Sequence, residues 1–93
     1  MFKIIKSKYF DKKAKKLTKN NHKLALKIAG VVDNLQQDPL LPSLGSHKVN
    51  TPKFGQCFSS RVTGDLRIIW RYDIDNRLEI LELLDLGSHG EVY

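Results

Sequence analysis

The chain has 93 residues, 41% of them hydrophobic, with a formal net charge of +6 and a sequence pI of about 9.6. This length fits one domain, residues 1–93, and the hydrophobic content excludes a disordered tail. The excess of lysine and arginine favours an anionic partner, such as nucleic acid, a ribosome or an acidic protein segment. No apolar run approaches the roughly 20 residues of a membrane helix, so no membrane contact is expected.

The first residues and the cysteine content favour a cytoplasmic protein without a cofactor. Residues 1–6 are too short and too charged for a signal peptide. Cys57 is the single cysteine, so it cannot form an internal disulfide, and we expect an inert packed thiol. The three histidines and Cys57 lack the spacing of a zinc site, and no glycine-rich phosphate loop is present. We therefore expect neither a metal site nor a cofactor.

A short strand and two helices are predicted for the first part of the chain. Residues 2–7 favour a strand, and Ser7 can cap a helix over about residues 8–19. A second apolar stripe predicts a helix over about residues 22–37. Gly30 costs this helix stability, so we expect it to permit close packing. Two helices joined this closely form an antiparallel hairpin.

The first predicted helix carries a dense set of lysines outside its apolar stripe: Lys12, Lys13, Lys15, Lys16 and Lys19. Such a run is most often a solvated helix face. It can also contact RNA phosphates or an acidic partner, so both interpretations stay open.

Residues 39–55 show no clear periodicity and contain all three prolines. Loops of more than roughly 12–15 residues without regular structure are uncommon in compact domains and are often functional. This segment carries His47 and Lys48, which makes it a candidate part of a site.

Three consecutive strands are predicted over residues 57–63, 66–72 and 78–86. Gly64-Asp65 and Asp75-Asn76 supply the turns between them. The helical hairpin can cover only one face of such a sheet. The prediction is therefore a two-layer α+β fold with an N-terminal strand, a helical hairpin and a three-stranded antiparallel meander.

Strict alternation predicts the two faces of the last strand. Leu84 and Leu86 should share one face, with Leu81 and Leu83 on the other. We therefore expect this strand to be buried on both sides near its middle.

The preceding strand separates its apolar and basic side chains more cleanly. Its alternation places Trp70 and its apolar neighbours on the core face, and Arg67 and Arg71 on the opposite face. The face without helices should then carry Arg61 together with Arg67 or Arg71, with the tail of residues 87–93 beside it.

Three strings in the sequence resemble the RelE/ParE superfamily of toxins from bacterial toxin–antitoxin modules. They are Arg61-Val-Thr-Gly-Asp65-Leu-Arg67-Ile-Ile-Trp70, Leu86-Gly-Ser-His89-Gly-Glu-Val-Tyr93 and, more weakly, His47-Lys48-Val49. The expected order of elements matches over the whole chain. The resemblance implies a metal-independent messenger-RNA endonuclease, acting at the ribosome or free of it, that inhibits translation and is held off by a cognate antitoxin.

The tail is most similar to that of the YafQ-type messenger-RNA endonucleases. His89 and Tyr93 match a histidine used in RNA cleavage and an aromatic residue that follows it, and His47 is similar to a loop histidine. Arg61 stands where those enzymes have a second catalytic histidine, and matches the arginine of RelE-like members instead. Leu66 replaces the tryptophan after their catalytic aspartate. These departures leave the division of acid and base roles open.

Metal-free RNA cleavage needs a base for the 2′-OH, positive charge for the phosphoryl oxygens and an acid for the leaving 5′-oxygen. On the resemblance, His89 is the general acid or base, His47 or Lys48 is its complement, and Asp65 orients a partner. Two arginines would hold the scissile phosphate and an aromatic side chain would stack on a base. The catalytic candidates are His89, His47, Asp65 and Arg61; the substrate-binding candidates are Arg67, Lys48 and Tyr93.

Each assignment has a plainer alternative. The histidines could be surface side chains, Asp65 a turn residue, and Arg67 the partner of a cross-strand ion pair with Glu79. The whole chain could instead be a ParE-like toxin that binds DNA gyrase without cleaving RNA. An inactive relative that only binds an antitoxin is a further possibility.

Overall fold

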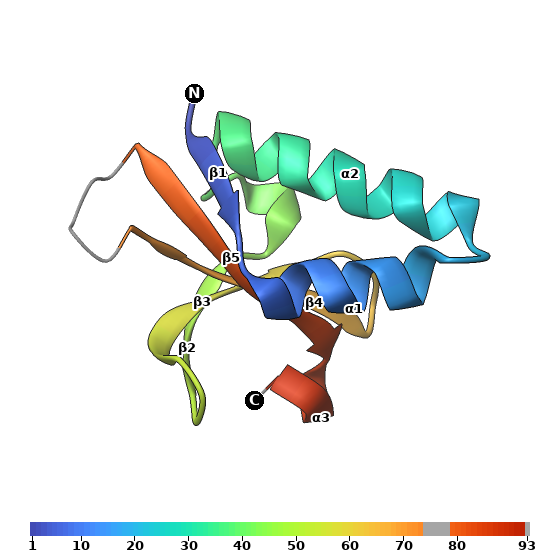
Figure 1. The fold of residues 1–93 in the computed structure, drawn as a ribbon. Coiled ribbons are helices and arrows are strands. Elements are labelled where there is room, and N and C mark those ends of the chain that lie inside the picture. Colours follow the sequence, from blue (N-terminus) through green and yellow to red (C-terminus); the bar gives the residue numbers. More distant parts are fainter. Residues whose placement is uncertain (74–78, 93) are drawn as a thin grey trace.

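A computed structural model describes residues 1–73 and 79–92, apart from the side chains of His89 and Glu91. The five strands form one sheet in the order β1-β5-β4-β3-β2, in which β1 runs parallel to β5 and the other pairs are antiparallel. The predicted α+β architecture is confirmed. In chain order the elements are β1 (Lys3–Lys6), α1 (Lys8–Thr18), α2 (His22–Gln37), a short 3-10 helix η1 (Pro42–Leu44), β2 (His47–Thr51), β3 (Gly55–Arg61), β4 (Leu66–Tyr72), β5 (Ile80–Ser88) and α3 (His89–Val92) (Figure 1).

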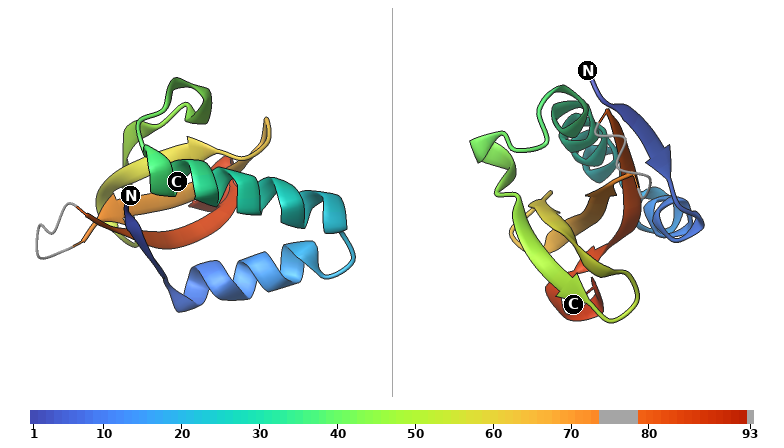
Figure 2. Two further views of the ribbon diagram at one scale, coloured as in Figure 1. Left: turned by 90° about the horizontal axis from the view of Figure 1, so that it is seen from above. Right: turned by 90° about the vertical axis from the view of Figure 1, so that its left-hand side faces the viewer.

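Side-chain caps fix where the two long helices begin. The Ser7 side chain accepts a hydrogen bond from the Phe10 amide at 3.1 Å, and Asn21 accepts one from the Leu24 amide at 3.0 Å. Each bond satisfies one of the amides that a helix start leaves unpaired. The two helices form the predicted antiparallel hairpin: α2 packs over one face of the sheet, and α1 lies beside β5, past the end of β1 (Figure 2).

The main core lies between this hairpin and the sheet, and Trp70 is at its centre. Its indole is 0% exposed and stacks on the Phe58 ring, with 4.5 Å between the ring centroids. The indole Nε1–H donates to Ser60 Oγ at 2.7 Å, so the one polar atom of the ring is satisfied. The buried members of this core are Phe10, Ile28, Leu35, Leu44, Val62, Ile68, Trp70, Leu81, Leu83 and Leu86.

The sheet contains one strand that was not predicted, in addition to the N-terminal strand and the three strands of the meander. β2 lies in the segment 39–55, for which no regular structure was predicted, and it pairs antiparallel with β3. Only Thr51 of its five residues is buried. An edge strand that buries so little carries no alternating hydrophobic signal, which is why periodicity missed it.

A β-bulge changes the faces of β5. Ile69 lies opposite Asp85, but Trp70 lies opposite Leu83, so Leu84 is an extra residue on β5. Leu83 and Leu86 consequently both face the helices, and Leu84 faces the other side. The prediction that Leu84 and Leu86 share a face is therefore wrong, whereas the burial of this strand on both sides is confirmed.

The face away from the helical hairpin holds a second, smaller apolar cluster. Cys57, Ile69 and Leu84 pack there against Val92 of α3, which is 5% exposed. Part of the tail therefore folds onto the sheet face that was expected to be open. The predicted turn at Asp75-Asn76 and the side chain of Tyr93 lie outside the described residues.

The strand boundaries differ from the predicted ones by about two residues. β3 begins and ends earlier than predicted, and β5 begins and ends later. Within residues 1–73 and 79–92, none of the helices combines the length and the apolar composition needed to cross a bilayer.

Gly30 does not serve close packing, contrary to the expectation. It is exposed in the middle of α2, and a Cβ added there would meet no atom within 4 Å. We expect Gly30→Ala to stabilise the protein by about 0.5–1 kcal/mol, because alanine limits the unfolded chain and favours the helix. Chemical denaturation of both variants would measure the change, and an unchanged or lower midpoint would contradict it.

Candidate functional site

Two arginines lie directly opposite each other at the end of the sheet near the β3–β4 turn. Arg61 of β3 pairs in register with Arg67 of β4, so both side chains leave the same face, with their Cβ atoms about 5 Å apart. This face is the one that carries Ile69, away from the helical hairpin. We refer to Arg61 and Arg67 as the arginine pair.

The arginine pair is uncompensated within the part of the chain that the structure describes. No ion pair there involves either guanidinium, and the buried Nε of Arg67 has no hydrogen-bond partner. Like charges opposite each other in a sheet destabilise it, and an unpaired buried donor costs about 1–3 kcal/mol. An anion with several acceptor oxygens would relieve both costs, so this end of the sheet is a candidate phosphate site.

The predicted alternative for Arg67, an ion pair with Glu79, is wrong. The register places Arg67 opposite Gly87, whereas Glu79 lies before β5 begins, at the other end of the sheet. The cross-strand ion pair belongs to Arg71 instead, whose Nε lies 3.5 Å from Glu82 Oε1. Arg71 therefore has a carboxylate within ion-pair distance, although its Nε, like that of Arg67, makes no hydrogen bond; Arg67 has no such carboxylate among the described residues.

His47 lies on the same face as the arginine pair. At the start of β2 it is opposite Ser59, which precedes Arg61 on the same face of β3. The ring is exposed, and its Nδ1 lies 3.1 Å from the Gly45 carbonyl oxygen. The fold thus places an imidazole one step along the sheet from the arginine pair.

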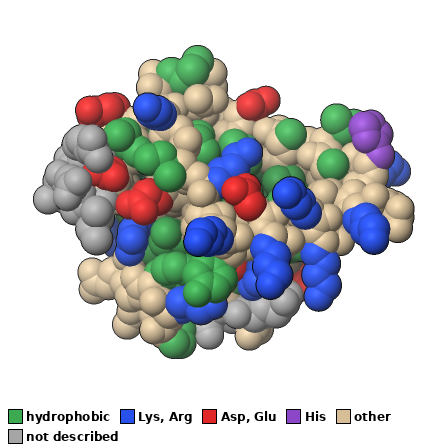
Figure 3. Space-filling view, viewed as in Figure 1, with side chains coloured by type: hydrophobic (Ala, Val, Ile, Leu, Met, Phe, Trp, Pro, Cys, Tyr) green, Lys and Arg blue, Asp and Glu red, His purple; other side chains and the backbone are tan. Residues whose placement is uncertain are grey.

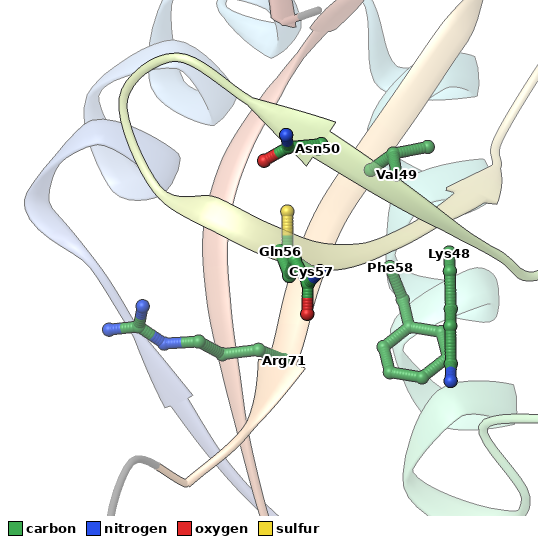
Figure 4. A pocket seen from close by; sticks show the side chains of 7 residues that line it. All are labelled: Lys48, Val49, Asn50, Gln56, Cys57, Phe58 and Arg71. Carbon is green, nitrogen blue, oxygen red and sulfur yellow. The ribbon is translucent and has the colours of Figure 1, made fainter.

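Lys48 points to the opposite face. It pairs with Phe58, whose ring packs against the main core, and Figure 4 shows the two side chains next to each other. Because neighbouring residues in a strand alternate between faces, Lys48 and His47 cannot serve the same ligand atom. The structure therefore separates Lys48 from the other predicted candidates.

The tail begins beside the arginine pair. Gly87 lies opposite Arg67 and Ser88 opposite Leu66, so the backbone of His89 starts just beyond the pair. α3 then packs on the face of the arginine pair through Val92. The side chains of His89 and Tyr93 lie outside the described residues, so their predicted roles stay predictions.

Asp65 lies in the turn between β3 and β4. Its backbone N–H and that of Leu66 both donate to Thr63 Oγ1, at 3.3 and 2.9 Å. The carboxylate is exposed and makes no ion pair with any described residue. Asp65 thus lies in a turn, as the alternative to a catalytic role predicted. It also lies at the same end of the sheet as the arginine pair.

Two hollows of the described surface lie away from the arginine pair. One, of about 480 Å³, is at the opposite end of β2, β3 and β4, with Cys57 and Arg71 in its lining (Figure 4). Burial raises the pKa of the Cys57 thiol, against the opposing effects of Thr51 and Arg71. This thiol is therefore not an activated nucleophile. The second hollow, of about 310 Å³, lies between α1 and α2.

The lysines of α1 form a second basic surface, with one exception. Lys13 Nζ lies 2.9 Å from Asp85 Oδ1, so this side chain is an ion-pair partner and not part of a solvated face. The others are exposed, and Lys and Arg side chains gather over α1 in the space-filling view (Figure 3). The remaining lysines on or at the end of this helix are Lys8, Lys12, Lys15, Lys16 and Lys19.

Gly45 lies next to two of the candidate residues, and the sequence reasoning did not single it out. It lies beside Arg61 and accepts the contact from His47. A signal was present, because the tetrapeptide Leu-Gly-Ser-His occurs at residues 44–47 and again at residues 86–89. In both copies the leucine is buried in the main core, which anchors the backbone that leads to the histidine.

Among the described residues, no group of three or more histidine, cysteine, aspartate or glutamate side chains is close enough together to hold a metal ion.

The chain is similar to solved structures of toxins over nearly its whole length. The chain matches no family profile and no curated protein. It is similar to a metal-bound toxin from Helicobacter pylori at 31% identity, with both chains covered completely and a TM-score of 0.78. It also resembles YafQ from Escherichia coli at 19% identity, over 98% of this chain and 97% of that one, with a TM-score of 0.72. A toxin–antitoxin complex of YoeB and YefM from Staphylococcus aureus matches at 16% identity, over 96% and 98% of the chains, with a TM-score of 0.72.

We expect inorganic phosphate to stabilise the protein through the arginine pair. At ten times its Kd, a bound anion adds about 1.4 kcal/mol, and Arg67→Gln should lose most of this gain. Arg71→Gln is the matched control, because Arg71 lies on the same strand and face but already pairs with Glu82. Thermal denaturation in phosphate and in chloride of equal ionic strength would measure both. Equal gains in the two variants would mean that the phosphate effect is general or arises elsewhere.

Proposed function

The chain belongs to the RelE/ParE superfamily of toxins, as its sequence strings predicted, and on that premise we propose that it is a messenger-RNA endonuclease. It would cut RNA without a metal ion, at the ribosome, and so inhibit translation. One observation carries the proposal: two arginines without a carboxylate partner among the described residues share one sheet face with an imidazole, where the tail begins.

The chemistry requires a phosphate between positive charges and two proton-transfer groups. The 2′-oxygen forms a new bond to phosphorus while the bond to the 5′-oxygen breaks. A base removes the 2′-OH proton, and an acid protonates the leaving 5′-oxygen. Negative charge grows on the phosphoryl oxygens during this step, where guanidinium donors stabilise it most.

The roles follow from what each group can donate or accept. Arg61 and Arg67 hold the scissile phosphate, and the unpaired Nε of Arg67 donates to one of its oxygens. His47 serves as the base, and His89 as the acid. Asp65, at the β3–β4 turn, orients one of these groups or the ribose. Tyr93 stacks on a base next to the cut. Lys48 is left out of this set because its strand register directs it to the other face.

A protein antitoxin is the partner expected for this toxin. YoeB forms a toxin–antitoxin complex with YefM, and we propose that the present chain is neutralised in the same general way. Both β1 and β2 are edge strands of the sheet, so an extended segment of the antitoxin could add to either edge.

The test of the nuclease is RNA cleavage by wild-type protein and by single-histidine variants. We expect His89→Ala and His47→Ala each to lower the rate by about 100- to 10,000-fold, the usual contribution of a general acid or base. His22→Ala is the matched control, because His22 is exposed at the start of α2, away from the sheet. Primer extension on transcripts from expressing cells, and on programmed ribosomes, would locate the cuts.

Two outcomes would overturn the proposal. Intact transcripts together with DNA damage on expression of the wild-type chain would favour the gyrase-binding alternative. Intact transcripts without any growth defect would favour an inactive relative that only binds an antitoxin.

Cleavage should not depend on a transition metal, although the Helicobacter pylori toxin was described as metal-bound. We expect an unchanged rate in the presence of a chelator that removes transition metals and leaves the magnesium of the ribosome in place. Loss of cleavage with the chelator, restored by one added metal, would exclude the metal-free mechanism.

A further inference from the structure

The short loop before β2 is held to the core by a continuous chain of hydrogen bonds. Trp70 Nε1–H donates to Ser60 Oγ at 2.7 Å, and Ser60 Oγ lies 2.6 Å from Ser46 Oγ. Ser46 Oγ–H donates to the Pro39 carbonyl at 2.7 Å, so the hydroxyl of Ser60 must donate to Ser46. Each of the three donor groups in this series of hydrogen bonds therefore has an acceptor. The series fixes the position of Ser46 and of its two neighbours.

Gly45, on one side of Ser46, provides the surface on which the Arg61 guanidinium lies. A Cβ added to Gly45 would be 3.0 Å from Arg61 Nη2 and 3.5 Å from its Cζ. The φ of Gly45 is 57°, a backbone conformation that residues with a side chain rarely adopt. The contact involves the far end of a flexible side chain. A side chain at position 45 would therefore shift the guanidinium by a few tenths of an ångström without breaking the core.

His47, on the other side of Ser46, is oriented by the same glycine. Its Nδ1 lies 3.1 Å from the Gly45 carbonyl oxygen. A carbonyl oxygen can only accept, so Nδ1 must carry the hydrogen. In the neutral ring the lone pair is then on Nε2, which is the form that a general base requires.

We infer that Gly45 is a positioning residue that places the Arg61 guanidinium and selects the Nδ1–H tautomer of His47. Its carbonyl orients the base and its missing side chain leaves room for the phosphate-binding arginine. The meaning of this arrangement for catalysis rests on the proposed nuclease function. The two contacts themselves can be tested without it.

The tautomer of His47 is directly measurable in the intact protein. Long-range ¹H–¹⁵N correlation spectra at about pH 8 should show His47 with its proton on Nδ1, and His47→Gln would assign the signals. His22 is the internal reference, since it is exposed and should keep the Nε2–H form that neutral histidine prefers in water. An Nε2–H form at His47 would overturn the inference, whether or not the protein cleaves RNA.

The second arm compares Gly45→Ala with Gly55→Ala. Gly55 has a φ of 70°, and a Cβ added there meets no atom within 4 Å, so both variants carry the same kind of backbone strain. Only Gly45→Ala should displace Arg61. We expect it to weaken binding of inorganic phosphate roughly tenfold, the loss of one hydrogen bond to a charged group, with Gly55→Ala close to wild type.

Kinetics separate this inference from the proposed function. If the wild-type protein cleaves RNA, Gly45→Ala should lower kcat by up to about 100-fold while Gly55→Ala retains it. If the wild-type protein does not cleave RNA, the nuclease proposal fails, and phosphate binding and the tautomer still decide the role of Gly45. Equal phosphate affinity in the two variants would overturn that role.

Discussion

The hydrogen bond between the Trp70 indole and Ser60 is the interaction on which the geometry of the candidate site depends. The indole is fully buried, and leaving its N–H unpaired would cost about 1–3 kcal/mol. Ser60 satisfies it and is in turn bonded to Ser46, the residue between Gly45 and His47. The packing of Trp70 in the core is thereby linked to the position of the exposed His47 ring and of Gly45, which lies next to the Arg61 guanidinium.

The bulge in β5 performs a similar function for the tail. The extra residue, Leu84, turns to the face opposite the helical hairpin and joins Cys57 and Ile69 in a small apolar cluster. Val92 completes this cluster, so α3 is held on the same face as the arginine pair. The bulge also keeps Leu81, Leu83 and Leu86 together in the main core, whereas strict alternation would divide these leucines between the two faces.

The distribution of charge separates cations that have a carboxylate partner from cations that have none among the described residues. Lys13 and Arg71 each have a carboxylate partner, Asp85 and Glu82. Arg61 and Arg67 oppose each other, and among the described residues no carboxylate neutralises them. Their repulsion lowers the stability of the free protein, and a bound anion would reverse that effect. Unfavourable electrostatics confined to one place are typical of a site built to bind an oppositely charged ligand.

Local patterns in the sequence were enough to define the two helices, the cap at Ser7, and β4 with its apolar and basic faces, because these features depend on near neighbours in the chain. The three strings also led to the toxin superfamily. Tertiary structure alone decided the rest. β2 exists because β3 offers it a partner, the faces of β5 depend on a register shift, and Arg67 lies opposite Gly87 and not Glu79. Pairing between distant strands sets these features, and the alternation within a single strand carries no information about its partner.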